Sequence, residues 1–198
     1  MNTSTSSLSE MINSSIVVLT RPSVSTFEQY ERRGGMRDAL IYVGVAAALA
    51  GIVGFIFNLI FTGVAAAIGG LIAGLLTTLL GFTVFAFVLY FVGKQQGGTG
   101  SQDEVFYTCA LYTAPLLAIT GIVSAIPGLN CLLLPVTLAA YVYQLYLGYL
   151  ASRSSMNLGQ TPAIIAVVAA ILAQWVVGLI IAAIVITPFV INAATSGG

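Results

Sequence analysis

Charged residues are scarce in this chain, and histidine is absent. Its 198 residues include six lysines or arginines and six aspartates or glutamates, together 6% of the sequence. A soluble domain carries about 25% charged residues, so these charges are too few to cover a surface exposed to water. The absence of histidine excludes imidazole metal sites and histidine-dependent catalytic triads. A net charge of zero argues against nucleic acid as a partner.

Cysteine is also rare. Cys109 and Cys131 are the two cysteines of the chain, too few for a disulfide framework. The helix expected between them would separate them by roughly 27 Å, whereas a disulfide needs Cα atoms within about 7 Å. We therefore expect both to be small apolar packing residues.

Apolar sequence makes up most of the chain, with 59% hydrophobic residues. A membrane-spanning helix needs about 20 consecutive apolar residues, and the uncharged run between Asp38 and Lys94 accommodates two of them. Between these two, the Gly- and Ala-rich segment 62–74 is expected to form an extra helical turn or a shallow re-entrant stretch. Proline and glycine divide the later apolar sequence into three further helices, and Pro188 is expected to end the last. The sequence thus predicts an all-α integral membrane protein with five transmembrane helices, at about 39–61, 72–93, 105–126, 131–152 and 163–187.

The basic residues predict how these helices cross the membrane. All six fall on one side if five helices cross: Arg21, Arg32, Arg33, Arg37, Lys94 and Arg153. Short loops that carry Lys and Arg remain in the cytoplasm. We therefore predict that the amino terminus lies in the cytoplasm and the carboxy terminus outside. The six basic residues form three independent clusters along the chain.

This topology divides the chain into three regions. Residues 1–36 form a cytoplasmic segment with a short interfacial or amphipathic helix, 37–190 the five-helix membrane domain, and 191–198 a short external tail. In the first region, Ser25 and Glu28 have the spacing of a capping box that opens a short helix. The apolar stretch before it is too short to span, so it is expected to lie at the interface or to pack against the protein.

No carboxylate, amine or imidazole falls inside the predicted membrane helices. Such residues usually mark proton and ion pathways, so ion pumping, proton coupling and intramembrane hydrolysis by an acid, base or metal are not expected. We expect no catalytic residue, no metal and no cofactor.

Glutamine is the main polar residue of the last two predicted helices. Gln144 and Gly148 share one helix face, as do Gln174 and Gly178. Small residues allow close approach of two helices, and the amides could then bond across them. The alternative interpretation is that these residues form the polar lining of a substrate path.

Two further sets of residues are candidates for association. Gly70 and Gly74 form a small-xxx-small motif, which indicates close packing within the bundle or a homodimer contact. The basic residues on the predicted cytoplasmic side form a candidate surface for a protein partner: Arg32, Arg33, Arg37 and Lys94.

The order of these features resembles the Ypt-interacting-protein (Yip) family. Similar stretches are VVLTRPSVSTFEQYERRGGMRDAL, FYTCALYTAPLLAITGIVSAIPG and YLASRSSMNLGQTPAIIAVVAAILAQ, so the resemblance covers about residues 16–190. It implies a cytoplasmic amino-terminal segment and five membrane helices. In eukaryotic members it implies a protein of the endoplasmic reticulum or Golgi that binds Rab-type GTPases. The chain lacks the DLYGP-type motif of those members and is similar to short prokaryotic members.

Two functions from different classes remain open. The first is a membrane protein, of a prokaryotic plasma membrane or of the endoplasmic reticulum or Golgi in a eukaryote, that acts through association with the bilayer and with a protein partner or a second copy. The second is a transporter or channel for a neutral or lipidic substrate.

Overall fold

Helices form the whole architecture of the described part of the chain. The computed structural model describes residues 7–126 and 128–196, with side chains for all of these except 130 and 185–196. The helices are α1 (Leu8–Thr20), α2 (Val24–Glu28), α3 (Met36–Phe61), α4 (Val64–Gln95), α5 (Gln102–Ala125), α6 (Leu129–Leu132), α7 (Leu134–Ser155) and α8 (Gln160–Ser196).

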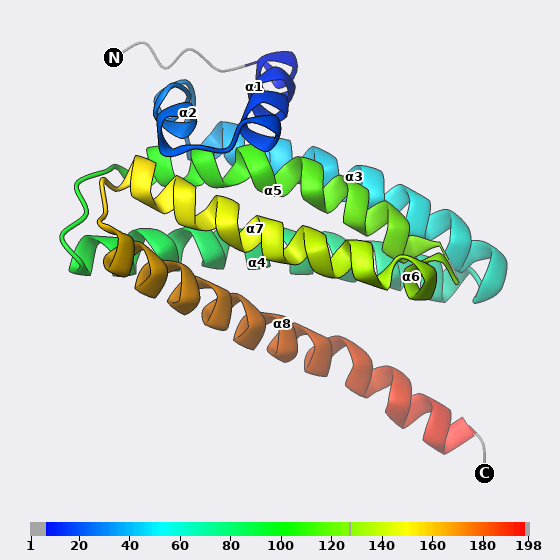
Figure 1. Cartoon of the computed structure of the whole chain (residues 1–198). Coiled ribbons are helices and arrows are strands. Elements are labelled where there is room, and N and C mark those ends of the chain that lie inside the picture. The colour runs from blue at the N-terminus through cyan, green and yellow to red at the C-terminus, as the bar shows by residue number, and fades with distance from the viewer. Residues whose placement is uncertain (1–6, 127, 197–198) are drawn as a thin grey trace.

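The five long helices lie side by side and place the short helices at opposite ends of the bundle (Figure 1). α3 packs mainly against α5 and α4, α7 lies on α5, and α8 packs mainly against α4. At one end, which we call the polar end, α1 and α2 gather with the α4–α5 and α7–α8 loops. At the other, the far end, lie α6 and the turn between α3 and α4. Toward the far end α8 diverges from α7 (Figure 1).

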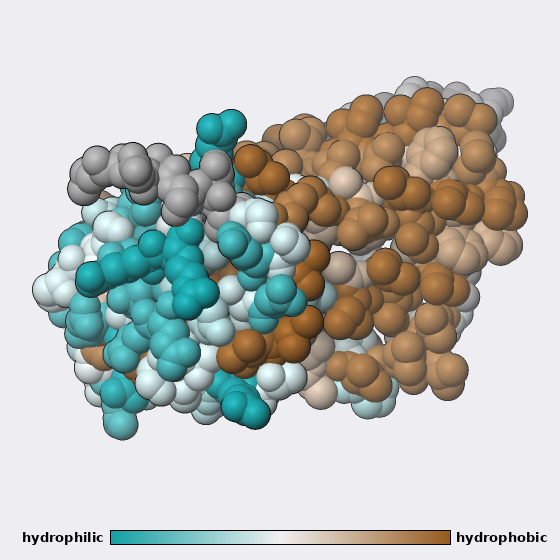
Figure 2. All heavy atoms as spheres, turned by 90° about the horizontal axis from the view of Figure 1, so that it is seen from above, coloured by the Kyte–Doolittle hydropathy of each residue, from teal (hydrophilic) through white to brown (hydrophobic). Residues whose placement is uncertain are grey.

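The charge distribution follows the same axis. In the five long helices, charged residues occur only in the turns nearest the polar end, such as Asp38 in α3, Lys94 in α4 and Arg153 in α7. Figure 2 shows a hydrophilic surface at the polar end and a hydrophobic surface over the rest of this face. The molecule therefore presents an apolar belt and a single charged end.

Four helices of the described residues are long and apolar enough to cross a membrane: Met36–Phe61, Val64–Gln95, Gln102–Ala125 and Gln160–Ile184. α7 has 22 residues but is not among the four. Four tyrosines and Gln144 reduce its hydropathy. The prediction of a helical membrane protein is therefore confirmed, while the structure provides four apolar spans and a more polar fifth long helix.

Two helix boundaries differ from the sequence-based prediction. The 62–74 segment is not re-entrant, because Gly63 (φ +95°) makes the turn after α3 and α4 begins at Val64. α8 does not end at Pro188 but continues to Ser196, so residues 191–196 of the predicted external tail are helical. Membrane helices tolerate proline where neighbouring groups replace the lost backbone hydrogen bond. Residues 197 and 198 lie outside the described residues.

The side-chain core lies toward the polar end. Ten consecutive residues of α5, Val105–Ala114, are buried there, and Phe82 of α4 meets Phe106 edge-on with ring centroids 6.0 Å apart. Cys109 belongs to this core, whereas Cys131 on α6 is exposed, so the packing role expected for Cys131 is wrong. The tight core holds the polar end together, while the far halves of the helices are left more open.

Candidate functional site

A folded cap covers the polar end. We define the polar cap as residues 7–35 together with the loops 94–104 and 153–160. α2 docks on α7 and α1 docks on α5. Phe27 of α2 is fully buried and meets Tyr112 edge-on, with ring centroids 6.3 Å apart. The amino-terminal segment is therefore anchored to the membrane helices by its apolar side chains.

The start of α2 differs from the predicted capping box. Ser23, not Ser25, is the N-cap, and its hydroxyl accepts a hydrogen bond from the backbone N–H of Thr26 at 3.1 Å. α2 ends at Glu28, and turns continue the chain to Arg33. The early end of the helix allows Glu31 to point toward α7.

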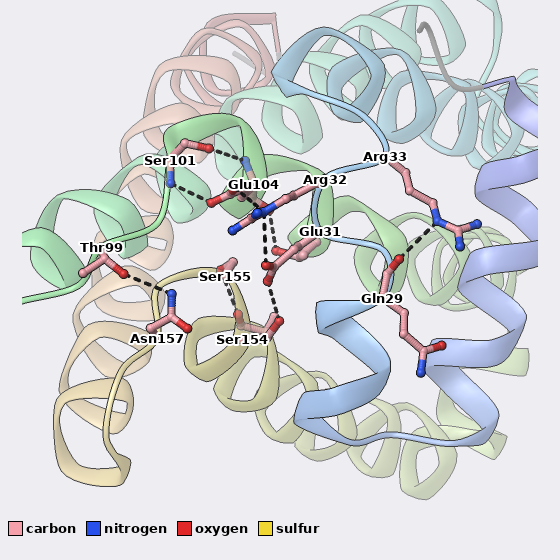
Figure 3. Close-up of polar contacts among 12 residues, drawn as sticks. Gln29, Glu31, Arg32, Arg33, Thr99, Ser101, Glu104, Ser154, Ser155 and Asn157 are labelled. Atoms are coloured by element: carbon pink, nitrogen blue, oxygen red, sulfur yellow. Dashed lines mark hydrogen bonds and ion pairs between the residues drawn. The ribbon is translucent and has the colours of Figure 1, made fainter. Parts of the chain in front are cut away.

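Glu31 forms the central polar contact of the cap (Figure 3). Its carboxylate accepts a hydrogen bond from the Ser154 hydroxyl at 2.8 Å, across 123 residues of sequence. Arg32 Nε lies 3.7 Å from the same carboxylate and 3.2 Å from that of Glu104 on α5. Three separate segments of the chain thus meet at one small cluster of charges.

The environment of Glu31 changes its acidity. Burial raises the pKa of this carboxyl, and the negative charges of Glu104 and Glu28 act in the same direction. The Ser154 hydrogen bond and the Arg32 guanidinium oppose the rise. The carboxyl is therefore easier to protonate in the docked cap than in a solvated segment.

The predicted basic surface lies at this end, and its members have different roles. Arg32 is exposed over 78% of its side chain although it pairs with Glu31 and Glu104. Arg33 lies over the Tyr30 ring at 4.7 Å, and Lys94 lies 5.6 Å from the Tyr90 ring centroid and donates to the Thr99 carbonyl oxygen at 3.3 Å. Arg37 is exposed at the start of α3. All four are accessible from outside the bundle.

The two loops of the cap lock against each other. The Thr99 N–H donates to the Met156 carbonyl oxygen at 3.0 Å, and the Asn157 amide donates to the Thr99 hydroxyl at 3.0 Å (Figure 3). Asn157 adopts a left-handed conformation (φ +53°). A Cβ at Gly100 would overlap the Ser155 carbonyl oxygen, so only glycine fits this crossing. The cap is thus supported by backbone contacts as well as by charge.

The second candidate region is a groove between α4, α7 and α8, with a volume of about 570 Å³. Gln144 of α7 and Gln174 of α8 both line it, together with Thr77 and Tyr141. Among the described residues, neither glutamine side chain has a hydrogen-bond partner. We call this space the glutamine groove.

The small residues near the groove differ in environment. Gly148 is buried, and a Cβ there would lie 3.2 Å from the Tyr112 hydroxyl. Gly178 lines the groove, and a Cβ there would meet no atom within 4 Å. Gln174 instead packs over Gly81 of α4. α8 therefore approaches α4 more closely than it approaches α7, the partner considered from the sequence.

A further cavity of about 390 Å³ lies between α3, α4 and α5 toward the far end. Gly70 and Gly74 line it, and both are exposed. A Cβ at Gly70 would lie 3.4 Å from the Asn58 amide nitrogen, and one at Gly74 would meet no atom within 4 Å. The structure thus places this pair beside an opening and not in a tight helix contact.

Within the described residues there is no cluster of three or more cysteine or acidic side chains that could hold a metal ion. Sequence reasoning missed the buried Glu31–Ser154 contact. The signal available was the shared helical spacing of Phe27, Tyr30 and Glu31, which places a carboxylate beside a core aromatic residue.

A family model described as the Yip1 domain matches residues 16–184, which is most of the chain. The matched range begins within α1 and extends into α8, so it includes most of the polar cap and the whole glutamine groove. No curated protein and no solved structure matches.

Proposed function

The chain belongs to the Yip1 domain family, and on that premise we propose that it is a multi-pass membrane protein that acts by binding other proteins and not by catalysis. In this proposal it is a short, prokaryotic-type member that resides in the plasma membrane. If the host cell is eukaryotic, it resides in the membrane of the endoplasmic reticulum or Golgi. The polar cap lies in the cytoplasm and five helices cross the bilayer. α7 is the crossing helix that is not among the four apolar spans, because its 22 residues extend about 33 Å and it packs against two of those spans, α5 and α8.

The observation that carries this proposal is the polar cap itself. It is the charged end of an otherwise apolar surface (Figure 2), and electrostatic complementarity is an effective basis for partner choice. Arg32 and Arg33 are exposed, while the amino-terminal segment that bears them is fixed to the bundle by Phe27 and Glu31. A fixed, charged surface costs less ordering on binding than a loose tail would.

The test is the mass of the assembly that the full chain forms in its own membrane. After cross-linking and extraction in mild detergent, native mass spectrometry should show a species above the monomer of 20.5 kDa. The double charge reversal Arg33→Glu/Arg37→Glu should reduce that species at least about tenfold, as expected for the loss of interfacial charge pairs. Asn13→Asp, on α1 of the same cap, is the matched control. A monomer alone, or equal loss in both variants, would contradict the proposal.

The glutamine groove favours a second candidate function, the transport of a neutral or lipidic substrate. Gln144 and Gln174 come from different helices and line the same space, as a polar path through a membrane protein would require. Flux through reconstituted protein that is unchanged in Gln144→Leu/Gln174→Leu would count against this function.

A further inference from the structure

The glutamine groove lies deep in the apolar belt. Gln144 is eleven residues from the polar-end terminus of α7, or about 16 Å along the helix, and Gln174 is fourteen residues from that of α8, or about 21 Å. Because the hydrocarbon core is about 30 Å thick, both amides lie near its middle. An amide that has no hydrogen-bond partner in hydrocarbon is destabilised, so these side chains favour a partner that reaches them there.

The lining of the groove specifies the chemistry of that partner. Its side-chain polar groups are the two amides, the hydroxyls of Thr77 and Tyr141 and the indole N–H of Trp175, and no lining residue is charged. Amides and hydroxyls both donate and accept hydrogen bonds. A phosphate, carboxylate or ammonium group would be desolvated here without an opposite charge, at high cost. The groove therefore suits an uncharged group that both donates and accepts.

The inner wall of the groove adds a further hydroxyl. Tyr112 is fully buried, and its hydroxyl has no hydrogen-bond partner among the described residues, although Cys109 and Thr113 of its own helix lie close by. A Cβ at Gly148 would touch this hydroxyl, Phe85 and Val167, and the last two line the groove. The Tyr112 hydroxyl thus lies behind the groove wall formed by Phe85 and Val167, and it is buried there.

The groove opens sideways toward the hydrocarbon. Its rim residues Trp175, Leu179 and Leu145 are 71%, 70% and 45% exposed. A ligand can therefore enter from the bilayer with its chain left among the lipids. A helix of a partner protein would occupy roughly 400–600 Å³ per turn. The groove volume of about 570 Å³ therefore holds no more than a single turn of such a helix. A head group with the upper part of its chain fits better, within the usual size of ligand pockets.

We propose that the glutamine groove binds a neutral lipid through a head that bears hydroxyl or amide groups, such as a diacylglycerol. Gln144 and Gln174 hydrogen-bond the head, and the chain lies between α7 and α8. This inference rests on the second candidate function, but it concerns binding at equilibrium and does not require transport.

The test uses the full chain in phosphatidylcholine nanodiscs doped with a diacylglycerol that carries a photoactivatable group in one acyl chain. Cross-links mapped by mass spectrometry should saturate and fall on α7 and α8 beside the groove. Unlabelled diacylglycerol should compete, whereas phosphatidic acid with the same chains should not. Equal competition by both lipids would overturn the proposal, because it would indicate ordinary lipid contact with the apolar belt.

Two variants test the groove itself. Gln144→Leu/Gln174→Leu should reduce saturable labelling about five- to tenfold, as the loss of two modest hydrogen bonds predicts. Gln95→Leu/Gln96→Leu, exposed at the polar end of α4, is the matched control and should bind normally. Gly178→Leu inserts a side chain where a Cβ has open space, so it should block the groove even if the double variant is unstable. Undiminished labelling in Gly178→Leu, or cross-links to a second protein chain at this site, would overturn the proposal. Binding of the lipid without flux across the membrane would leave the binding proposal intact and would exclude only the transport function.

Discussion

Glu31 connects the amino-terminal segment to α7 through one hydrogen bond, and it is the buried acidic residue of the polar cap. Its raised pKa means that the docked cap binds a proton more tightly than the undocked segment does. The contribution of protonated Glu31 to docking is therefore fully present below the ordinary pKa of 4.5. It is lost as the pH rises through the raised value. Arg32, Glu104 and Glu28 also face this carboxyl and set how far the loss extends.

We expect the cap to loosen as the pH rises through the raised pKa of Glu31. Spin labels at Gln29→Cys and Gln160→Cys, both exposed positions of the cap, with Cys109→Ala and Cys131→Ser, would report the distance across the cap. Its distribution should broaden with increasing pH in the otherwise native chain. Glu31→Gln mimics the protonated carboxyl, so its distribution should stay narrow throughout. If Glu31→Gln broadened at the same pH, another group would be responsible.

Individual residues were predictable from sequence to different extents. The polarity of Gln144 and Gln174 within apolar helices identified them as candidates, because a polar side chain in hydrocarbon is costly and usually has a structural or functional role. Their surroundings could not be predicted, because these depend on α8 packing on α4 and diverging from α7. Glu31 shares helical spacing with Phe27 and Tyr30, but this spacing does not indicate a partner for its carboxylate. Its burial depends on Ser154, which no local pattern connects to it.

α1 is the element whose exposed surface divides most clearly by chemistry. Its buried residues, Met11, Ser14, Ser15 and Val18, occupy one side of the helix and face the bundle. At about 100° per residue, Leu8, Ile12 and Ile16 form the next sector, and they are 43%, 49% and 55% exposed. Ser9, Glu10 and Asn13 form the sector beyond and are also exposed. A helix that lies beside a bundle at a membrane surface needs these three faces: protein, lipid and water.

We therefore expect the Leu8–Ile12–Ile16 face to enter the cytoplasmic side of the bilayer. Trp175 is the single tryptophan of the chain, so Trp175→Phe provides a dark background. In that background Ile12→Trp should emit at short wavelength and be quenched by lipids brominated in the upper acyl chain. The adjacent Asn13→Trp should emit as in water and be quenched by iodide. Strong iodide quenching at both positions would show that α1 lies in water.

Helix existence was easier to predict than helix neighbours. Apolar runs bounded by glycine, proline and charges located every long helix, because each membrane helix must satisfy its own backbone hydrogen bonds. Which helices pack together depends on side-chain shapes far apart in the sequence. The sequence indicated close approach of the last two helices, whereas α4 is the main partner of α8. The resemblance to the family, which rested on diffuse patterns over the whole chain, is confirmed by the match over residues 16–184.

The molecule as a whole combines one charged end with an apolar belt, and its orientation depends on whether α7 crosses the bilayer. If it does, the α5–α7 connection and the α7–α8 loop lie on opposite sides of the membrane. The chain has a natural reporter for the first position, because Cys131 on α6 is exposed, while Cys109 is buried and should not react. For the second, Asn157 is exposed in the α7–α8 loop.

We predict that a membrane-impermeant maleimide labels Cys131 in intact cells. Asn157→Cys, in a Cys131→Ser background, should react only after the membrane is opened. A reporter fused after Gly198 should then be active outside the cytoplasm, because five crossings reverse the side of the amino terminus. Lys94 and Arg153 supply the physical reason, since loops that carry positive charge are retained inside. Labelling of both positions from the same side would mean that α7 does not cross, and the four apolar spans would then return the carboxy terminus to the cytoplasm.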